Sequence, residues 1–341
     1  MLNNKKNNAY IDLIRLLSAC GVLLVHLGNE MQLKGKLKEI TGSGIHGVEI
    51  FMLISGFLIM STLGKRETLK QFYTKRFFRI APVYYFVIIF SIIYLNINKV
   101  QFEPDSIGWA RYFTFTSTLL PSNDPNWINW GATWTISSFV LFYLIAPLLY
   151  KIINTYNKAI VYIGFQILVS FYLLDDVYNI VGKILGVDLT SVLGYSPIIN
   201  LSYFAFGIAA YFAINENKTF NYIIFLSILL IVQQSGFTYG FSRIPYTIAG
   251  TIMILLLNNR ELNNQKVSRA ITSLSKYSYT LYLVHPLTVY VFGSYKINFS
   301  NTYNYLIALT LVIFIVTFLT YHIIEKPLGT IPNKILKCKK K

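Results

Sequence analysis

The sequence predicts an all-α, polytopic membrane helical bundle with about ten transmembrane helices. Of the 341 residues, 54% are hydrophobic and 13% are charged, whereas soluble domains carry roughly 25% charged residues. Mean hydropathy is +0.50. Apolar runs recur from end to end, and a run of about 18 or more such residues can cross the hydrocarbon core. We therefore expect a single transmembrane domain over residues 1–341, with short tails at 1–10 and 324–341.

Ten apolar stretches are candidate spans. They cover residues 11–28, 45–62, 81–97, 131–150, 159–174, 196–214, 220–233, 243–257, 272–292 and 305–323. With ten spans and a cytoplasmic N-terminus, most of the 30 lysines and arginines fall on the cytoplasmic side, as the positive-inside rule requires. The sequence therefore predicts that both termini are cytoplasmic. This topology also explains the net charge of +16, so we expect membrane lipids around the chain and no nucleic-acid partner.

The first span carries three ionisable groups. Asp12 and Arg15 are three residues apart and share a helical face. Arg15 and His26 are eleven residues apart, close to three full turns, so they share a face across about 16 Å of helix. Ionisable groups inside spans mark function by default. The alternative is that Arg15 reaches the headgroups and His26 bonds a neighbouring helix.

Arg76 and Arg79 form a second candidate site before the third span. They are three residues apart, and Pro82 suits the first turn of a helix. The sequence thus predicts two forked donors beside a helix N-terminus, where free N–H groups also favour phosphate. Ordinary positive-inside charge explains the pair equally well.

Two further ionisable residues lie within predicted spans. His285 stands before Pro286 in the ninth span, where a proline weakens the backbone ladder and can open a pocket. Glu49 lies in the second span. For each, an interhelical hydrogen bond is an equally good interpretation. No cluster has metal-ligand spacing, so we expect no metal site and no tightly bound cofactor.

Taken in order, these motifs resemble the acyltransferase family 3 proteins, integral membrane acyltransferases that modify bacterial surface polysaccharides. The resemblance covers the chain from Tyr10 to Pro327. The resemblance has five pieces. The first is YIDLIR from Tyr10 with His26, the second is GVEIF from Gly47 with SGFL from Ser55, and the third is RFFRIAP from Arg76. The fourth is SYTLYLVHP, which contains His285, and the fifth is Glu325-Lys326-Pro327. Each piece alone is weak, but five in the family's order are specific.

Two departures from the family pattern matter. Many members carry a glutamate a few residues after a Trp-Ser/Thr pair, whereas this chain has Phe139 after Trp134-Thr135. This difference suggests another subgroup or acceptor. Some members also append an extracytoplasmic hydrolase-like domain. We expect none here, so the protein either finishes the transfer alone or hands the acyl group to a partner.

The resemblance implies a membrane O-acyltransferase, most simply an O-acetyltransferase, of the bacterial cytoplasmic (inner) membrane. The implied donor is acetyl-CoA or another acyl-CoA, and the implied acceptor is a sugar hydroxyl of a lipid-linked oligosaccharide or exported polysaccharide, such as capsule or lipopolysaccharide. His26 then acts as a base or an acyl carrier, and His285 as a second base or a pocket-shaping group. The implied donor-binding residues are Arg76, Arg79 and Arg15, with Asp12, Glu49 and Ser55 in support.

A transporter for a sugar-lipid or polyanionic substrate is the main alternative, because intramembrane charge alone fits it equally. A polysaccharide polymerase is a third possibility. A polymerase would need a large external loop with catalytic groups, and the longest predicted loop, about 175–195, is modest.

Overall fold

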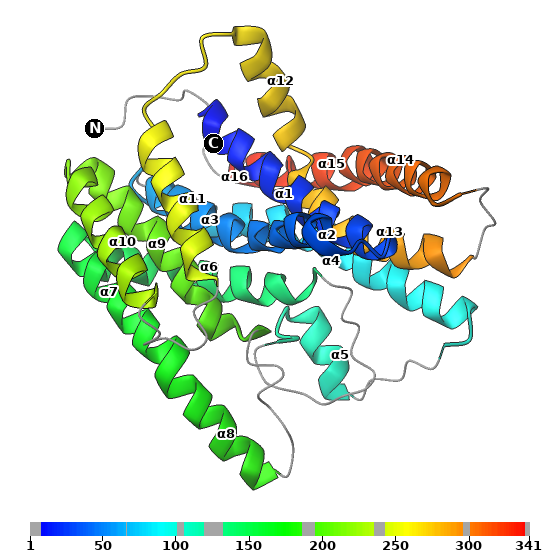
Figure 1. The fold of residues 1–341 in the computed structure, drawn as a ribbon, viewed down its shortest axis with the longest axis horizontal. Coiled ribbons are helices and arrows are strands. Elements are labelled where there is room, and N and C mark those ends of the chain that lie inside the picture. Colours follow the sequence, from blue (N-terminus) through cyan, green and yellow to red (C-terminus); the bar gives the residue numbers. More distant parts are fainter. Residues whose placement is uncertain are drawn as a thin grey trace.

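The structure is a computed structural model that describes residues 8–65, 67–100, 106–118, 132–185, 195–234, 243–295 and 301–337. Within these ranges all regular secondary structure is helical (Figure 1). The all-α prediction is therefore confirmed for the described residues. The predicted tails fall partly outside them, at residues 1–7 and 338–341.

Each of the ten predicted spans overlaps a helix. The longer helices are α1 (Ala9–Glu30), α3 (Gly47–Leu63), α4 (Leu69–Ile97), α6 (Trp134–Ile152), α7 (Tyr156–Leu168), α9 (Pro197–Asn215), α10 (Thr219–Gln234), α11 (Ile244–Leu257), α13 (Ser278–Ser294) and α14 (Thr302–Thr320). The shorter ones are α2 (Gly35–Gly42), η1 (Ser43–His46), α5 (Ser106–Phe113), η2 (Val169–Leu173), α8 (Leu174–Leu185), α12 (Gln265–Ser275), η4 (Tyr321–Glu325), α15 (Lys326–Leu328) and α16 (Ile331–Lys337).

Six segments of the described chain are long and apolar enough to cross a membrane. They are Ala9–Glu30, Gly35–Leu63, Leu69–Ile97, Trp134–Ile152, Pro197–Asn215 and Thr302–Leu336. The chain is thus a multi-pass membrane protein by helix length and composition. Ten spans and cytoplasmic termini stay predictions.

The prediction for the third span was wrong about where its helix starts. Thr68 and Gln71 form a capping box that begins α4 at Leu69, and such reciprocal bonds satisfy the free N–H groups of a helix start. Pro82 lies inside α4, a position that membrane helices tolerate because neighbouring groups satisfy the freed backbone. Arg76 and Arg79 therefore lie mid-helix, and no helix N-terminus contributes to an anion site there.

Two other boundaries differ from the prediction. The range 272–292 contains two helices, because the short amphipathic α12 ends at Ser275 and α13 begins at Ser278. The range 175–195 was interpreted as a loop, yet η2 and α8 continue α7 as far as Leu185. Residues 186–194 of that range lie outside the described residues.

Close backbone contact between α3 and α9 holds the centre of the bundle. A Cβ atom added to Gly56 would meet the Phe204 carbonyl oxygen at 2.3 Å, and one added to Gly207 would meet the Leu53 carbonyl oxygen at 2.0 Å. Small residues that let backbones approach are the usual means by which membrane helices associate. On its other side, α3 packs against α1, which also contacts α13 (Figure 1).

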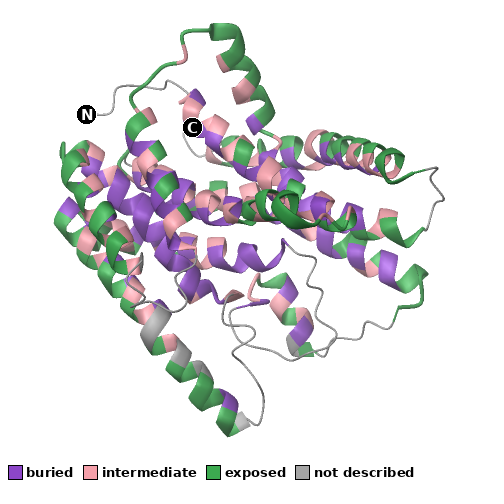
Figure 2. Cartoon of the chain, in the orientation of Figure 1, coloured by how far each residue is buried: buried purple, intermediate pink, exposed green. Residues whose placement is uncertain are grey.

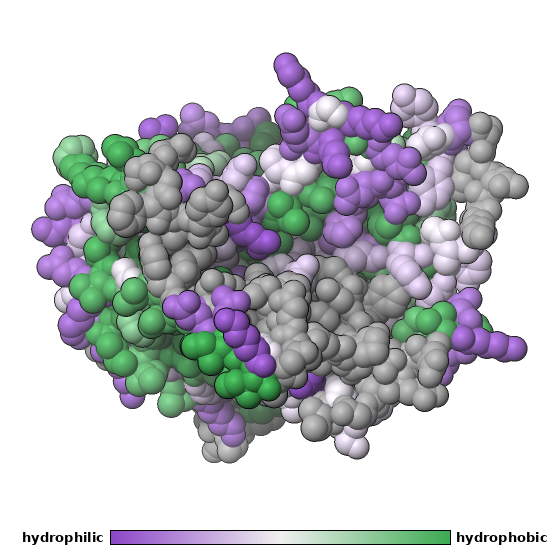
Figure 3. Space-filling model, turned by 60° about the horizontal axis from the view of Figure 1, so that its bottom comes forward, coloured by the Kyte–Doolittle hydropathy of each residue, from purple (hydrophilic) through white to green (hydrophobic). Residues whose placement is uncertain are grey.

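Burial follows the pattern of a bundle in lipid. Buried residues concentrate where helices meet, and exposed ones lie on outward faces (Figure 2). Many outward side chains are apolar, such as Ile307, Leu311 and Phe314 on α14. In the view of Figure 3, hydrophobic residues form broad patches, with hydrophilic residues mostly toward the edges of the molecule. Such faces suit lipid rather than water.

Candidate active site

An internal cavity of about 290 Å³ lies between α1, α3, α4, α6 and α13. It brings together four residues that the sequence analysis singled out from three separate motifs, namely Arg15, Ser55, Arg76 and Arg79. Much of the remaining wall is apolar or aromatic, and its residues are Val48, Phe51, Leu58, Ile59, Ile80, Thr135, Ile136, Phe139, Tyr143, Ser278, Tyr279 and Tyr282. The lining of the cavity therefore combines a largely apolar wall with three arginines from α1 and α4.

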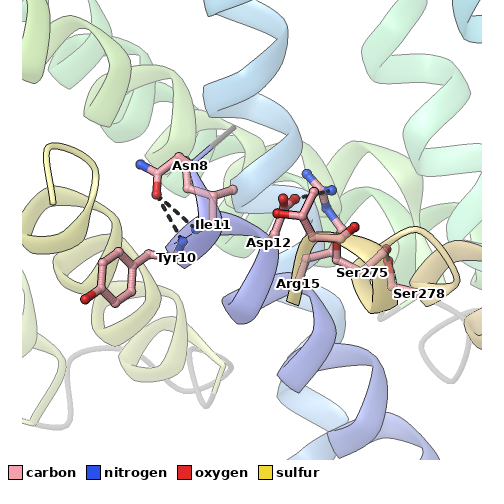
Figure 4. A network of polar contacts seen from close by, with 8 residues as sticks. Asn8, Tyr10, Ile11, Asp12, Arg15, Ser275 and Ser278 are labelled. Carbon is pink, nitrogen blue, oxygen red and sulfur yellow. Dashed lines mark hydrogen bonds and ion pairs between the residues drawn. The ribbon is translucent and has the colours of Figure 1, made fainter. Parts of the chain in front are cut away.

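Two of the three arginines are neutralised by carboxylates. Arg15 pairs with Asp12 one turn earlier on α1, at 3.2 Å, beside Ser275 and Ser278 where α12 meets α13 (Figure 4). Arg79 pairs with Glu325 of η4. Glu325 is buried and also accepts a hydrogen bond from Thr280 of α13. The second pair thus ties α4 to the closing motif and to α13.

Arg76 has different surroundings. Among the described residues no carboxylate pairs with it, and its nearest side-chain acceptor is the Thr62 hydroxyl, 3.5 Å from Nη2. Its guanidinium lies over the rings of Phe72 and Tyr143, at 5.5 and 5.7 Å from their centroids. Its Nε atom is buried without a hydrogen-bond partner. Because buried polar groups are costly unless paired, Arg76 is suited to an anionic ligand.

Phe139 is one reason why Arg76 lacks a carboxylate partner among the described residues. Its ring lines the cavity and packs against Phe204 and Tyr143, at centroid distances of 5.3 and 6.2 Å. Tyr143 is the ring beneath Arg76. Helix α6 has no acidic residue anywhere in its sequence. A glutamate at position 139 would add a carboxylate near Arg76, whereas phenylalanine leaves that guanidinium unmatched.

The two predicted histidines meet although they are far apart in sequence. The rings of His26 on α1 and His285 on α13 are edge to face, with centroids 4.9 Å apart. His285 is buried and His26 half-buried. Neither histidine lines the cavity itself, but Tyr282 connects the two regions. Its ring lies in the cavity wall, 6.2 Å from the His285 ring centroid.

Glu49 lies apart from the cavity lining. It is 1% exposed and accepts a hydrogen bond of 3.0 Å from Arg243 at the start of α11. His46 Nδ1 lies 3.6 Å from its other oxygen, and the His46 ring stacks on Tyr246. The contacts of Glu49 thus join α3 to α11, and its predicted supporting role stays a prediction.

Sequence reasoning missed Glu325, Tyr143 and Arg243 as members of these networks. Glu325 was noted only as part of the closing motif. The criterion that singled out Glu49 was an ionisable group within a predicted span, and the last span was predicted to end at residue 323, two residues before Glu325. Arg243 met this criterion as the first residue of the range 243–257, whereas Tyr143 carries no comparable signal. Among the described residues, no group of three or more His, Cys, Asp or Glu side chains could hold a metal ion.

The helical, multi-pass fold and the cavity between its helices define an integral membrane protein with arginines in the wall of a largely apolar site. Residues 8–324 match the family described as "Acyltransferase domain". The chain belongs to this family, so it is an acyltransferase by family. The family resemblance drawn from the five motifs is thereby confirmed.

Three curated proteins are similar in sequence to this chain. Nodulation protein 10 of Rhizobium leguminosarum is 28% identical over 206 residues, 51% of this chain and 54% of the relative. Putative acetyltransferase ORF330 of Acidianus two-tailed virus is 24% identical over 263 residues, 72% of this chain and 74% of the relative. Peptidoglycan O-acetyltransferase OatA of Listeria monocytogenes is 33% identical over 144 residues, 40% of this chain and 20% of the relative.

The first match therefore spans about half the length of its relative, and the OatA match a fifth. No solved structure matches the chain.

Proposed function

We propose that this acyltransferase is an O-acetyltransferase of the bacterial cytoplasmic membrane. It moves an acetyl group from acetyl-CoA to a hydroxyl of a lipid-linked or exported surface-polysaccharide sugar. The observation that carries the proposal is Arg76, a cation with no carboxylate partner among the described residues, in a cavity whose wall includes Tyr282, a neighbour of His285. Two relatives named as acetyltransferases support the acetyl group.

The cavity fits the acyl-bearing arm of the donor. Coenzyme A combines phosphates with a slender, largely uncharged arm that ends in the thioester. A cavity of about 290 Å³ lies at the small end of ligand sites, so it accommodates the arm rather than the whole molecule. Arg76 then binds a phosphate through charge-assisted hydrogen bonds. Arg15 and Arg79 are already paired, so they shape the site and add weaker attraction.

The histidine pair fits the acceptor end. His26 is partly exposed, and neutral imidazole is the usual general base near pH 7. His26 takes the proton of the sugar hydroxyl as its oxygen bonds to the acetyl carbonyl carbon. The carbon–sulfur bond then breaks, and the leaving thiolate takes up the proton. The products are the acetylated sugar and coenzyme A, with no other reactant.

Thiol release by the purified protein tests this proposal. Reconstituted protein is given acetyl-CoA with lipid-linked oligosaccharide from the same organism, and free coenzyme A and acetylated product are measured. The wild-type protein should release thiol and form an acetyl ester together, and a deletion strain should lack O-acetyl groups on its surface glycans. Movement of the sugar-lipid without thiol release would instead establish the transporter alternative.

A further inference from the structure

We propose that His285 is a positioning residue for His26. Its Nε2 atom accepts a hydrogen bond from His26, and this bond determines which nitrogen of His26 receives the acceptor's proton. The inference rests on the proposed function and gives the second histidine a role distinct from that of the first. It is carried by the contacts of the two rings.

The hydrogen bonding of His285 indicates its tautomer. Its Nδ1 atom lies 2.8 Å from the carbonyl oxygen of Leu281, one turn earlier on α13. A carbonyl oxygen can only accept, so the hydrogen of a neutral imidazole must lie on Nδ1. Nε2 therefore keeps its lone pair and can only accept. This contact is made within one helix, so it is present whether or not a substrate is bound.

The lone pair on Nε2 has no donor within the described protein. The atom is buried and without a hydrogen-bond partner, and an unsatisfied buried acceptor costs about 1–3 kcal/mol. The nearest candidate donor is the His26 ring, 4.9 Å away between centroids and inclined at 70°. Two imidazoles joined by an N–H···N bond have centroids about 5 Å apart, given ordinary hydrogen-bond lengths. A rotation of the half-buried His26 side chain closes this bond.

The other titratable group that faces His26 is engaged elsewhere. Glu30 lies one turn further along α1 and accepts a hydrogen bond of 3.0 Å from Tyr305 of α14. Among the described residues, His285 is thus a group from a neighbouring helix that can fix the hydrogen on His26. Once one nitrogen of His26 donates to His285, the other keeps its lone pair for the sugar hydroxyl. Hydrogen bonds of this kind commonly set the tautomer of a catalytic histidine.

Two substitutions at His285 separate positioning from packing. His285→Gln places an oxygen near the position of Nε2 and keeps an acceptor for His26. His285→Asn keeps a donor near the Leu281 carbonyl but lacks that acceptor, so it is the matched control. We expect Gln to stay within about tenfold of wild-type kcat and Asn to lose about 100-fold, the range of lost orienting partners. The KM for acetyl-CoA should stay constant in both.

Equal losses in kcat for Gln and Asn, or a KM that rises with the loss, would overturn the positioning role. If wild-type protein released no coenzyme A at all, the proposed function itself would fail, which is a different outcome.

A second measurement needs no change at His285. Nitrogen NMR of protein labelled at its four histidines, assigned with His26→Gln, His46→Gln and His322→Gln, should show His285 protonated on Nδ1. A hydrogen on Nε2 would refute the inference.

Discussion

Arg76 and Arg79 lie about one turn apart on α4, yet they have different electrostatic surroundings. Arg79 pairs with the buried Glu325, whereas Arg76 has no carboxylate partner among the described residues. The sequence pattern treats the two alike, because the residue that distinguishes them is 246 positions from Arg79. Only the folded chain separates an arginine that lacks a carboxylate partner from one that is paired across helices.

Substitution of these two arginines should therefore have different effects. Arg76→Ala removes a charge-assisted contact to phosphate worth about 1.5–3 kcal/mol, so the KM for acetyl-CoA should rise about 10- to 100-fold. Arg76→Lys should also raise it, because lysine lacks the bidentate fork. Arg79→Ala should mainly lower the melting temperature in detergent, because it leaves Glu325 buried and unpaired. The reverse pattern would show that Arg79 is the donor-binding residue.

His26 should be the histidine most sensitive to substitution. His26→Ala removes the proposed base and should lower the acetylation rate by about 10²–10⁴. Membrane insertion should be unchanged, because loss of an intramembrane polar group rarely harms it. His322→Ala is the matched control. Its Nε2 atom lies 3.1 Å from the Tyr277 hydroxyl, and it is not part of the histidine pair. Rates are compared at equal protein levels. Near-normal acetylation by His26→Ala would remove this residue from the chemistry.

At the scale of single helices, position 139 decides whether α6 brings a carboxylate close to Arg76. Phe139→Glu should raise the KM for acetyl-CoA, because its carboxylate neutralises Arg76 through the space beside Tyr143. Phe139→Leu is the control, because it changes the size of the wall but not its charge. KM and melting temperature are measured for both variants. A similar rise in KM for Leu would show that the Phe139 ring acts by packing, not by keeping α6 free of charge.

An ion pair between Glu49 and Arg243 joins α3 to the start of α11, beside the packing of Gly250 against Ile50 and Leu53. Arg243→Ala should destabilise the protein by about 1–3 kcal/mol, since Glu49 stays buried without its partner while Arg243 is itself partly exposed. A second change, Glu49→Gln, should recover part of this loss. The measurement is a double-mutant cycle from melting curves. Additive losses from the two changes would mean that the pair does not couple the helices.

The sequence predicted those features of the helices that depend on neighbouring residues, and it did not predict contacts between distant helices. Each apolar run overlaps a longer helix of the described chain, because a helix in lipid must present apolar side chains along most of its length. The start of α4 was misplaced because Pro82 was interpreted as a first-turn residue, while the signal was the capping box at Thr68. The spacing from Arg15 to His26 predicted a shared helical face, and in the structure Arg15 lines the cavity while His26 contacts His285. The partner of His26 could not be predicted, because it comes from a helix late in the chain.

For the whole molecule, the distribution of lysine and arginine predicts ten spans with both termini in the cytoplasm. Reporter fusions should report cytoplasm after Arg66 and after Lys341, which lie outside the described residues, and exterior near Asp176 on α8. The reason is the excess of basic residues in the loops that the topology places inside. A periplasmic signal from the fusion after Lys341 would require an odd number of spans.

The link between Arg79 and Glu325 also bears on biosynthesis. Helices enter the bilayer in the order in which the ribosome makes them, and Arg79 is translated 246 residues ahead of its partner. Until η4 emerges, α4 presents two arginines to the interior of the bundle, and Arg79 lacks its carboxylate partner. The difference in charge between these two arginines is therefore established at a late step of synthesis. A nascent chain that stalls before Glu325 holds both histidines, all three arginines and every residue that lines the cavity, but its Arg79 has not yet met Glu325.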